Sequence, residues 1–197
     1  MADLKKAAKN LEERGFSVRL FETGAEAADY LDAAIDGKTV GFGGSITLRD
    51  MGVYERLASH NSVHWHWKET PVSTGEAATA QVYLSSVNGL DEDGTLINID
   101  GNGNRVASML YGHEKLYLVA GRNKLAATYD EALWRARNIA APKNAQRLNR
   151  KTPCAVKGDK CYDCKSPERI CRGLAVLWRP MSGMETEVIL IDEDLGY

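Results

Sequence analysis

All four cysteines of the chain fall within one short segment, spaced Cys154-x6-Cys161-x2-Cys164-x6-Cys171. Thiolates bind soft and borderline metals, and four of them complete either a tetrahedral zinc site or an iron–sulfur cubane. The Cys-x2-Cys pair would supply two ligands from one tight turn, and the longer arms would supply the others. Structural zinc sites more often contain two such pairs. The spacing therefore favours an iron–sulfur cluster, [4Fe–4S], with zinc as the alternative.

The charges around these cysteines suit a thiolate-bound metal. Four thiolates around Zn²⁺, or around an oxidised [4Fe–4S] core, leave a net charge of about -2. The segment contains more basic than acidic residues: Arg150, Lys151, Lys157, Lys160, Lys165, Arg169 and Arg172 against Asp159, Asp163 and Glu168. This excess of positive charge would offset the charge of the site.

Disulfides, or reduced thiols without a ligand, are the alternatives to a metal. Residues 1–10 are charged throughout and lack the apolar core of a signal peptide, so we expect a cytoplasmic protein. The reducing conditions of that compartment disfavour disulfides. A thioredoxin-like role for Cys161 and Cys164 is weakly supported, because that motif normally opens a helix directly after a strand.

A glycine-rich loop with the sequence VGFGGSIT starts at residue 40, where a predicted strand turns into a helix. Gly43 and Gly44 would let the backbone approach a ligand, and free N–H groups at the helix start favour an anion. Ser45 and Thr47 would add hydroxyl donors. The dinucleotide fingerprint needs a third glycine where Ile46 stands, and the Gly-Lys-Ser/Thr of a Walker loop is absent. A plain tight turn with a Ser or Thr cap is the alternative.

A second polar loop places Asp100, Asn104 and Arg105 after another predicted strand. Asp100, Asn102 and Asn104 match the first three ligands of a calcium loop. However, Arg105 stands where that loop needs glycine, and Tyr111 stands where it needs the bidentate glutamate. We therefore expect no calcium here.

A third loop, with Arg122, Asn123 and Lys124, follows a strand that reads as buried. Ligand sites in open α/β sheets lie at the carboxyl ends of the strands. Three such loops at one edge predict a pocket for a small carboxylate or phosphate. For each basic side chain taken alone (Arg105, Arg122 or Lys124), the alternative is that it is simply exposed to solvent.

Two histidines, His64 and His66, alternate with tryptophans on a predicted strand. A pair in this setting is more often a surface or packing feature than a set of metal ligands. The sequence offers no nucleophile–base pair, so it assigns no catalytic residue and leaves open whether the chain is an enzyme.

Alternating helical and strand patterns account for the rest of the chain. Helices are expected over residues 3–14, 23–35, 47–58, 75–82, 104–110 and 124–140, the last ending before Pro142. Strands are expected over residues 16–21, 38–42, 63–67, 83–87, 95–99, 115–120, 174–179 and 186–191. This alternation predicts an α/β fold with a mostly parallel sheet and helices on both faces. We expect a single domain over residues 1–197, with residues 150–172 as a Cys-rich, metal-binding C-terminal insertion.

The composition argues against two classes of partner. A formal net charge of -2 gives no general attraction to nucleic acid or to anionic membranes. No stretch approaches the roughly 20 apolar residues that a membrane-spanning helix needs, so we expect no membrane insertion.

Several motifs together resemble a known family. They are Gly43-Gly-Ser45 with Thr47 and Gly52, Asn88, Asp93-Gly94, Asn98-Ile-Asp-Gly101, Gly103-Asn-Arg105, Tyr111-Gly112 and Gly121-Arg-Asn-Lys124. With these motifs the chain resembles the lactate-utilization (LUD) domain family, formerly a domain of unknown function. The segment from Thr152 to Arg172 resembles the cysteine-bearing branch of that family.

This resemblance implies a fold similar to ribose-5-phosphate isomerase, glucosamine-6-phosphate deaminase and the CoA transferases. Those enzymes hold phosphate or carboxylate groups in a glycine-rich loop at the place occupied here by residues 41–47. The resemblance also implies an association with the oxidation of L-lactate to pyruvate, in which relatives work beside iron–sulfur partner subunits.

Three hypotheses follow. The chain is an accessory or catalytic subunit of 2-hydroxy-acid oxidation, with a cluster that passes electrons and a glycine rim that holds the anion. Alternatively, it is a stand-alone enzyme on a phosphorylated sugar or a CoA-like compound, with a structural zinc. In the third hypothesis it is a regulatory or assembly module without chemistry of its own.

Overall fold

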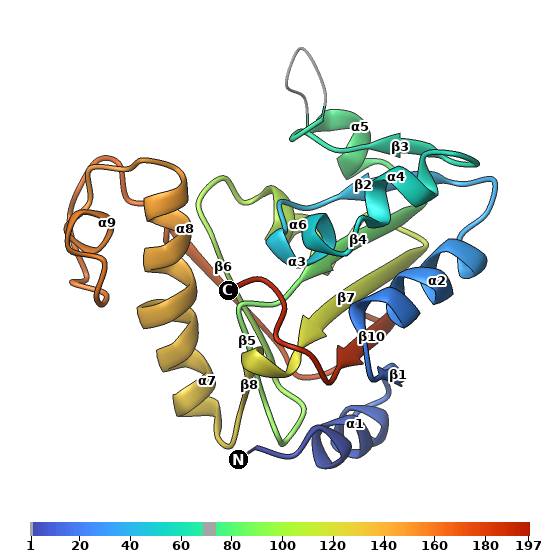
Figure 1. Ribbon diagram of the computed structural model, residues 1–197, viewed down its shortest axis with the longest axis horizontal. Coiled ribbons are helices and arrows are strands. Elements are labelled where there is room, and N and C mark those ends of the chain that lie inside the picture. Colours follow the sequence, from blue (N-terminus) through green and yellow to red (C-terminus); the bar gives the residue numbers. More distant parts are fainter. Residues whose placement is uncertain (1, 69–73) are drawn as a thin grey trace.

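A parallel sheet forms the centre of the computed structural model, which describes residues 2–68 and 74–197 (Figure 1). Its strands, in sheet order, are β1 (Ser17–Phe21), β10 (Glu185–Ile191), β7 (Lys115–Gly121), β4 (Val82–Ser86), β2 (Thr39–Phe42) and β3 (Ser62–His64). Every neighbouring pair in this sheet is parallel. The prediction of an α/β fold with a mostly parallel sheet is confirmed.

Helices cover both faces of this sheet, because the side chains of its strands alternate between two cores. Leu116 and Leu118 of β7 join one core, whereas Tyr117 and Val119 join the other. The first core also takes residues of α1 (Leu4–Glu13), α5 (Gly75–Ala78) and α6 (Asn104–Leu110). The second takes residues of α2 (Gly24–Ala34), α3 (Ile46–Asp50) and α4 (Val53–Leu57). Burial on both faces is typical of parallel sheets.

A second, smaller sheet, which the sequence pattern did not predict, lies beside the first. Its strands, in sheet order, are β8 (Leu125–Ala126), β5 (Gly89–Asp91), β6 (Leu96–Asp100) and β9 (Gly173–Leu177). The β5–β6 and β6–β9 pairs are antiparallel. For the β5–β6 pair the reason is the turn after β5, where Gly94 has φ +84° and Thr95 N–H donates to Asp91 Oδ1 at 2.8 Å. Such a tight turn returns the chain directly along its neighbour.

A long helical arm packs on the smaller sheet. It consists of α7 (Tyr129–Arg135), a π-helical turn (Ala136–Ala140) and α8 (Ala141–Arg147). Ala132 and Ala136 of the arm form a small core with Ile97 of β6. The prediction that this helix ends before Pro142 is wrong. A proline ring inside an α-helix clashes with the carbonyl four residues earlier, and the wider π-helical turn before Pro142 accommodates it.

Three other predicted boundaries also need correction. The helix expected over 47–58 is two short helices, α3 and α4, because Gly52 between them has φ +66° and interrupts the helical backbone. The strand expected over 63–67 ends at His64, and Trp65 is buried in the second core. The helix expected over 75–82 ends at Ala78, since residues from Val82 onward belong to β4.

Residues 150–172, which contain all four cysteines, follow α8 in the chain. They form one short helix, α9 (Pro153–Lys157), and otherwise irregular backbone. This segment packs against α8 on the side away from the central sheet (Figure 1). Within the described residues, no helix has both the length and the apolar character needed to cross a membrane.

Candidate functional site

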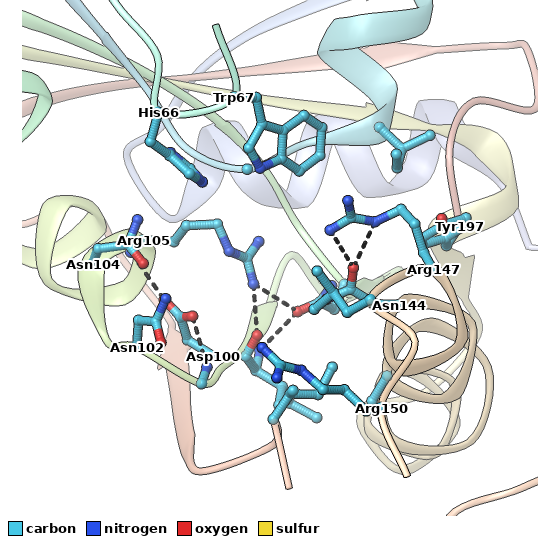
Figure 2. Close-up of a pocket in the computed structure, with 18 residues that line it drawn as sticks. His66, Trp67, Asp100, Asn102, Asn104, Arg105, Asn144, Arg147, Arg150 and Tyr197 are labelled. Atoms are coloured by element: carbon cyan, nitrogen blue, oxygen red, sulfur yellow. Dashed lines mark hydrogen bonds between the residues drawn. The ribbon is translucent and has the colours of Figure 1, made fainter. Parts of the chain in front are cut away.

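A cavity of about 290 Å³, here called the arginine pocket, lies where the loops after β2, β4 and β6 meet α8 (Figure 2). Arg105 of α6, Arg147 of α8 and Arg150 just beyond α8 line it, together with Asp100, the one acidic side chain among its described lining residues. The remaining lining residues are Gly44, Ile46, His66, Trp67, Asn88, Ile99, Gly101, Asn102, Asn104, Ala141, Asn144, Leu148, Ile170 and Tyr197. The pocket therefore combines an excess of guanidinium groups with several amides.

Arg105 is held in place by neutral acceptors. Its Nη2 donates to the backbone carbonyl of Ile99 at 2.6 Å, and its Nη1 donates to Asn98 Oδ1 at 3.3 Å. Asp100 does not pair with this guanidinium. Its Oδ2 instead accepts the backbone N–H of Arg105 at 2.9 Å, at the start of α6. Arg105 is thus fixed in position while its positive charge stays available to a ligand.

Arg147 is positioned by Asn144 and Trp67. Its Nε and Nη2 donate to Asn144 Oδ1 at 3.0 and 2.9 Å. Its guanidinium carbon lies 4.6 Å from the centroid of the Trp67 ring, a cation–π contact. Partial burial lowers the pKa of Arg147. Asn144 and Arg147 are absent from the sequence-based candidates because the helix that carries them was expected to end before Pro142.

Gly43 and Gly44 leave room for the side chains of the pocket wall. A Cβ on Gly44 would lie 3.1 Å from the Trp67 ring, and a Cβ on Gly43 would lie 2.9 Å from Ser85 Oγ and 3.1 Å from Arg105 Cγ. Both positions therefore need the absence of a side chain, although only Gly44 lines the pocket.

The hydroxyl groups of Ser45 and Thr47, in the glycine loop, form hydrogen bonds outside the arginine pocket. Ser45 Oγ accepts the backbone N–H of Leu48 at 3.2 Å and so caps α3. Thr47 is fully buried, and its Oγ1 accepts a hydrogen bond from Lys124 Nζ at 2.8 Å. The same Nζ donates to Ser86 Oγ at 2.6 Å. These groups tie α3 to the ends of β4 and β7 rather than lining the pocket.

Lys124 loses its proton more easily than an exposed lysine because its side chain is buried. Burial, followed by the nearby charges of Arg135 and Arg105, lowers the pKa of Lys124 from 10.5 to about 7.

This lowered pKa predicts a pH-dependent stability. Between about pH 7 and about pH 10 the unfolded chain binds a proton on Lys124 that the folded chain does not, so the free energy of unfolding should rise with pH across that range. Urea unfolding of Lys124→Met should lack this rise. If the free energy of unfolding changed with pH in the same way in the variant and the wild type, the lowered pKa of Lys124 would be contradicted.

Arg122 and Asn123 bind the chain segment that follows β10. Arg122 is exposed and pairs with Asp194 at 3.0 Å and Asp192 at 3.4 Å, and these carboxylates raise its pKa. Asn123 Oδ1 accepts the backbone N–H of Leu195 at 3.2 Å. Neither residue lines the arginine pocket.

The four cysteines line one small space, here called the thiol hollow, of about 10 Å³. Their thiols form no disulfide. Arg169 donates to the backbone carbonyls of Cys164 and Cys171 at 2.9 and 2.8 Å. Arg137 Nη2 lies 3.8 Å from Cys161 Sγ. Both guanidinium groups also pair with Asp163, at 3.3 Å for Arg137 and 3.0 Å for Arg169, so they share their charge between this carboxylate and the thiols.

The donor set of the thiol hollow fits a group bound by four cysteines. Among residues 2–68 and 74–197, however, no three or more His, Cys, Asp or Glu side chains are arranged to hold a metal ion. A single ion would thus require the thiols to move together. Burial raises the pKa of the Cys171 thiol, and the Arg169 charge partly opposes this effect.

The thiol hollow and the arginine pocket are neighbours. Ala141 and Ile170 line both of them. The backbone N–H of Arg172 donates to the Asp100 carbonyl at 2.9 Å. A Cβ on Gly101 would lie 2.6 Å from the Ile170 carbonyl oxygen, so the two backbones pack directly on each other. The loop that carries Asp100 and the segment that carries Cys171 form one wall.

A family model described as the LUD domain matches residues 4–191. The chain belongs to the LUD domain family. Among solved structures it is similar to a DUF162 family protein from Deinococcus radiodurans, a crystal structure at 1.70 Å resolution that carries the older name of this family. The two share 15% sequence identity over 95% of each chain, with a TM-score of 0.58, which supports the fold alone. A search of curated proteins finds no match.

Within this LUD domain the residues expected to bind the anion divide into separate groups. Gly44, Asp100, Asn104 and Arg105 come together in the arginine pocket. The others, which lie outside its lining, are Gly43, Ser45, Thr47, Arg122, Asn123 and Lys124. His66 also lines the pocket, whereas His64 Nε2 lies 3.4 Å from Ser62 Oγ.

Proposed function

We propose that this LUD domain binds a small carboxylate or phosphate in the arginine pocket and holds an iron–sulfur cluster in the thiol hollow. The chain would act as an accessory or catalytic subunit in the oxidation of L-lactate or a related 2-hydroxy acid. The observation that carries the proposal is the wall shared by the two sites, Ala141 and Ile170. Membership of the LUD family supports the link to lactate.

The residues of the pocket supply binding and orientation. Arg105 would hold the anionic group, since its guanidinium is fixed by the Ile99 carbonyl and by Asn98. The amides of Asn104 and Asn144 line the same cavity: that of Asn104 can donate to or accept from a hydroxyl group, and that of Asn144, whose oxygen accepts from Arg147, can donate to one. The charge-assisted hydrogen bonds that Arg105 would donate to the anionic group are about twice as strong as neutral ones.

The residues of the thiol hollow would hold the cluster. Cys154, Cys161, Cys164 and Cys171 are its four thiolate ligands in this proposal. When bound, such a cluster supplies one-electron transfer. Arg137 and Arg169 would lower the cost of placing its negative charge in a partly buried site.

Metal analysis and the ultraviolet–visible spectrum of protein purified without oxygen test this proposal. About four irons per chain with broad brown absorption would support the cluster. One zinc per chain without colour would contradict it, and would favour a structural metal beside a pocket with separate chemistry.

A further inference from the structure

The charges that line the arginine pocket exceed what one carboxylate can neutralise. Three guanidinium groups against the carboxylate of Asp100 leave a formal charge of +2 on the described side chains that line the pocket, counted at neutral pH with His66 uncharged. Asp100 itself is already engaged, because its two oxygens accept the backbone N–H groups of Gly101, Arg105 and Val106. A ligand must therefore bring the compensating charge.

The three arginines keep hydrogen-bond capacity for such a ligand. Arg147 uses Nε and Nη2 on Asn144, and no described residue accepts a hydrogen bond from its Nη1. The side chain of Arg150 donates to no acceptor in the described part of the chain, although it lines the cavity. Figure 2 shows Arg105, Arg147 and Arg150 around the same space. Arg105 belongs to one side of the pocket, and the other two belong to the α8 side.

The remaining polar groups of the pocket suit hydroxyls. Asn102, Asn104 and Asn144 present amides, which both donate and accept hydrogen bonds, as a hydroxyl does. The volume of about 290 Å³ is close to the lower limit of roughly 300 Å³ for small-molecule sites. The pocket thus has space for a molecule larger than a three-carbon monocarboxylate.

We infer that the arginine pocket takes a compact, hydroxylated dianion, with one anionic group on Arg105 and the second charge on Arg147 and Arg150. This inference rests on the proposed function and narrows its ligand. The second charge can come from a carboxylate or from a phosphate ester, since guanidinium groups bind both. Arg147 is then the residue that distinguishes dianions from monoanions, and its fixed position on Asn144 and Trp67 prepares it for that role.

Calorimetric titration of the full chain, purified without oxygen and kept at constant ionic strength, tests this inference. The probes are L-lactate, L-malate and glycerol 3-phosphate, which are a monoanion, a dicarboxylate and a phosphate monoester. We expect at least one dianion to bind roughly 10-fold or more tightly than L-lactate. Tighter binding of malate alone, or of glycerol 3-phosphate alone, would identify the source of the second charge.

The variant Arg147→Gln should remove most of this preference while changing the affinity for L-lactate little. Lys143→Gln is the matched control, because Lys143 is an exposed cation on the same helix outside the pocket lining. Equal affinities for all three probes in the wild type would overturn the dianion inference and leave the proposed function standing. Binding of none of the probes would overturn both.

Discussion

Replacing Cys164 with serine should abolish binding of the metal group proposed for the thiol hollow. A serine hydroxyl stays protonated near neutral pH and is a poor ligand for iron or zinc, which bind thiolate. Loss of one ligand from a four-thiolate site should lower metal affinity by at least the 10- to 100-fold typical of losing a supporting contact. We therefore expect the iron content and the brown absorption of Cys164→Ser to fall close to background in oxygen-free preparations.

The matched control is Lys165→Gln. Lys165 is exposed and adjacent in the chain, so its replacement alters the same segment without removing a thiol. It should keep the metal content of the wild type. If Cys164→Ser also kept its metal, Cys164 would not be a ligand and the four-cysteine assignment would fail.

Replacing Arg105 with alanine should weaken anion binding by roughly 10- to 100-fold. A hydrogen bond to a charged group contributes about 1.5–3 kcal/mol, which corresponds to that range of affinity. Arg105 is suited to this role because its described partners are neutral and leave its charge unpaired. Calorimetric titration with inorganic phosphate and with L-lactate measures the effect.

Two further variants make this result interpretable. Arg105→Lys keeps the charge but loses the planar fork of donors, so it should recover only part of the affinity. Arg122→Ala removes an exposed arginine that pairs with Asp192 and Asp194, and it should leave the affinity unchanged. An unchanged affinity in Arg105→Ala, or a loss in Arg122→Ala equal to that in Arg105→Ala, would contradict this description of the pocket.

The parts of the site that the sequence predicts are those encoded in short local motifs. The spacing of the cysteines predicts one common site, and all four do line one hollow, because the irregular segment from Cys154 to Cys171 folds back on itself. The loop from Asp100 to Arg105 follows a strand and starts a helix, so its residues reach the carboxyl end of that strand. The helix expected over residues 23–35 also begins where it was expected, because Thr23 and Glu26 exchange hydrogen bonds at the start of α2.

The parts that it does not predict depend on contacts between distant residues. Lys124 reads as a rim cation, yet it turns inward because Thr47 and Ser86 offer acceptors in the buried layer. Arg147 reaches the pocket only because the helix continues through Pro142, which the packing of Ala136 on the smaller sheet supports. The proximity of the thiol hollow to the arginine pocket likewise follows from the tertiary contact between Gly101 and Ile170.

The central claim is that the two sites work as one unit, and a single titration tests it most directly. Oxygen-free, reduced protein is titrated with L-malate or phosphate while the electron paramagnetic resonance spectrum of the proposed cluster is recorded. We predict a saturable change in that spectrum for the wild type and its absence in Arg105→Ala, because Ala141 and Ile170 separate the sites by one shared wall. Anion binding seen by calorimetry without any change in the cluster spectrum would contradict the claim.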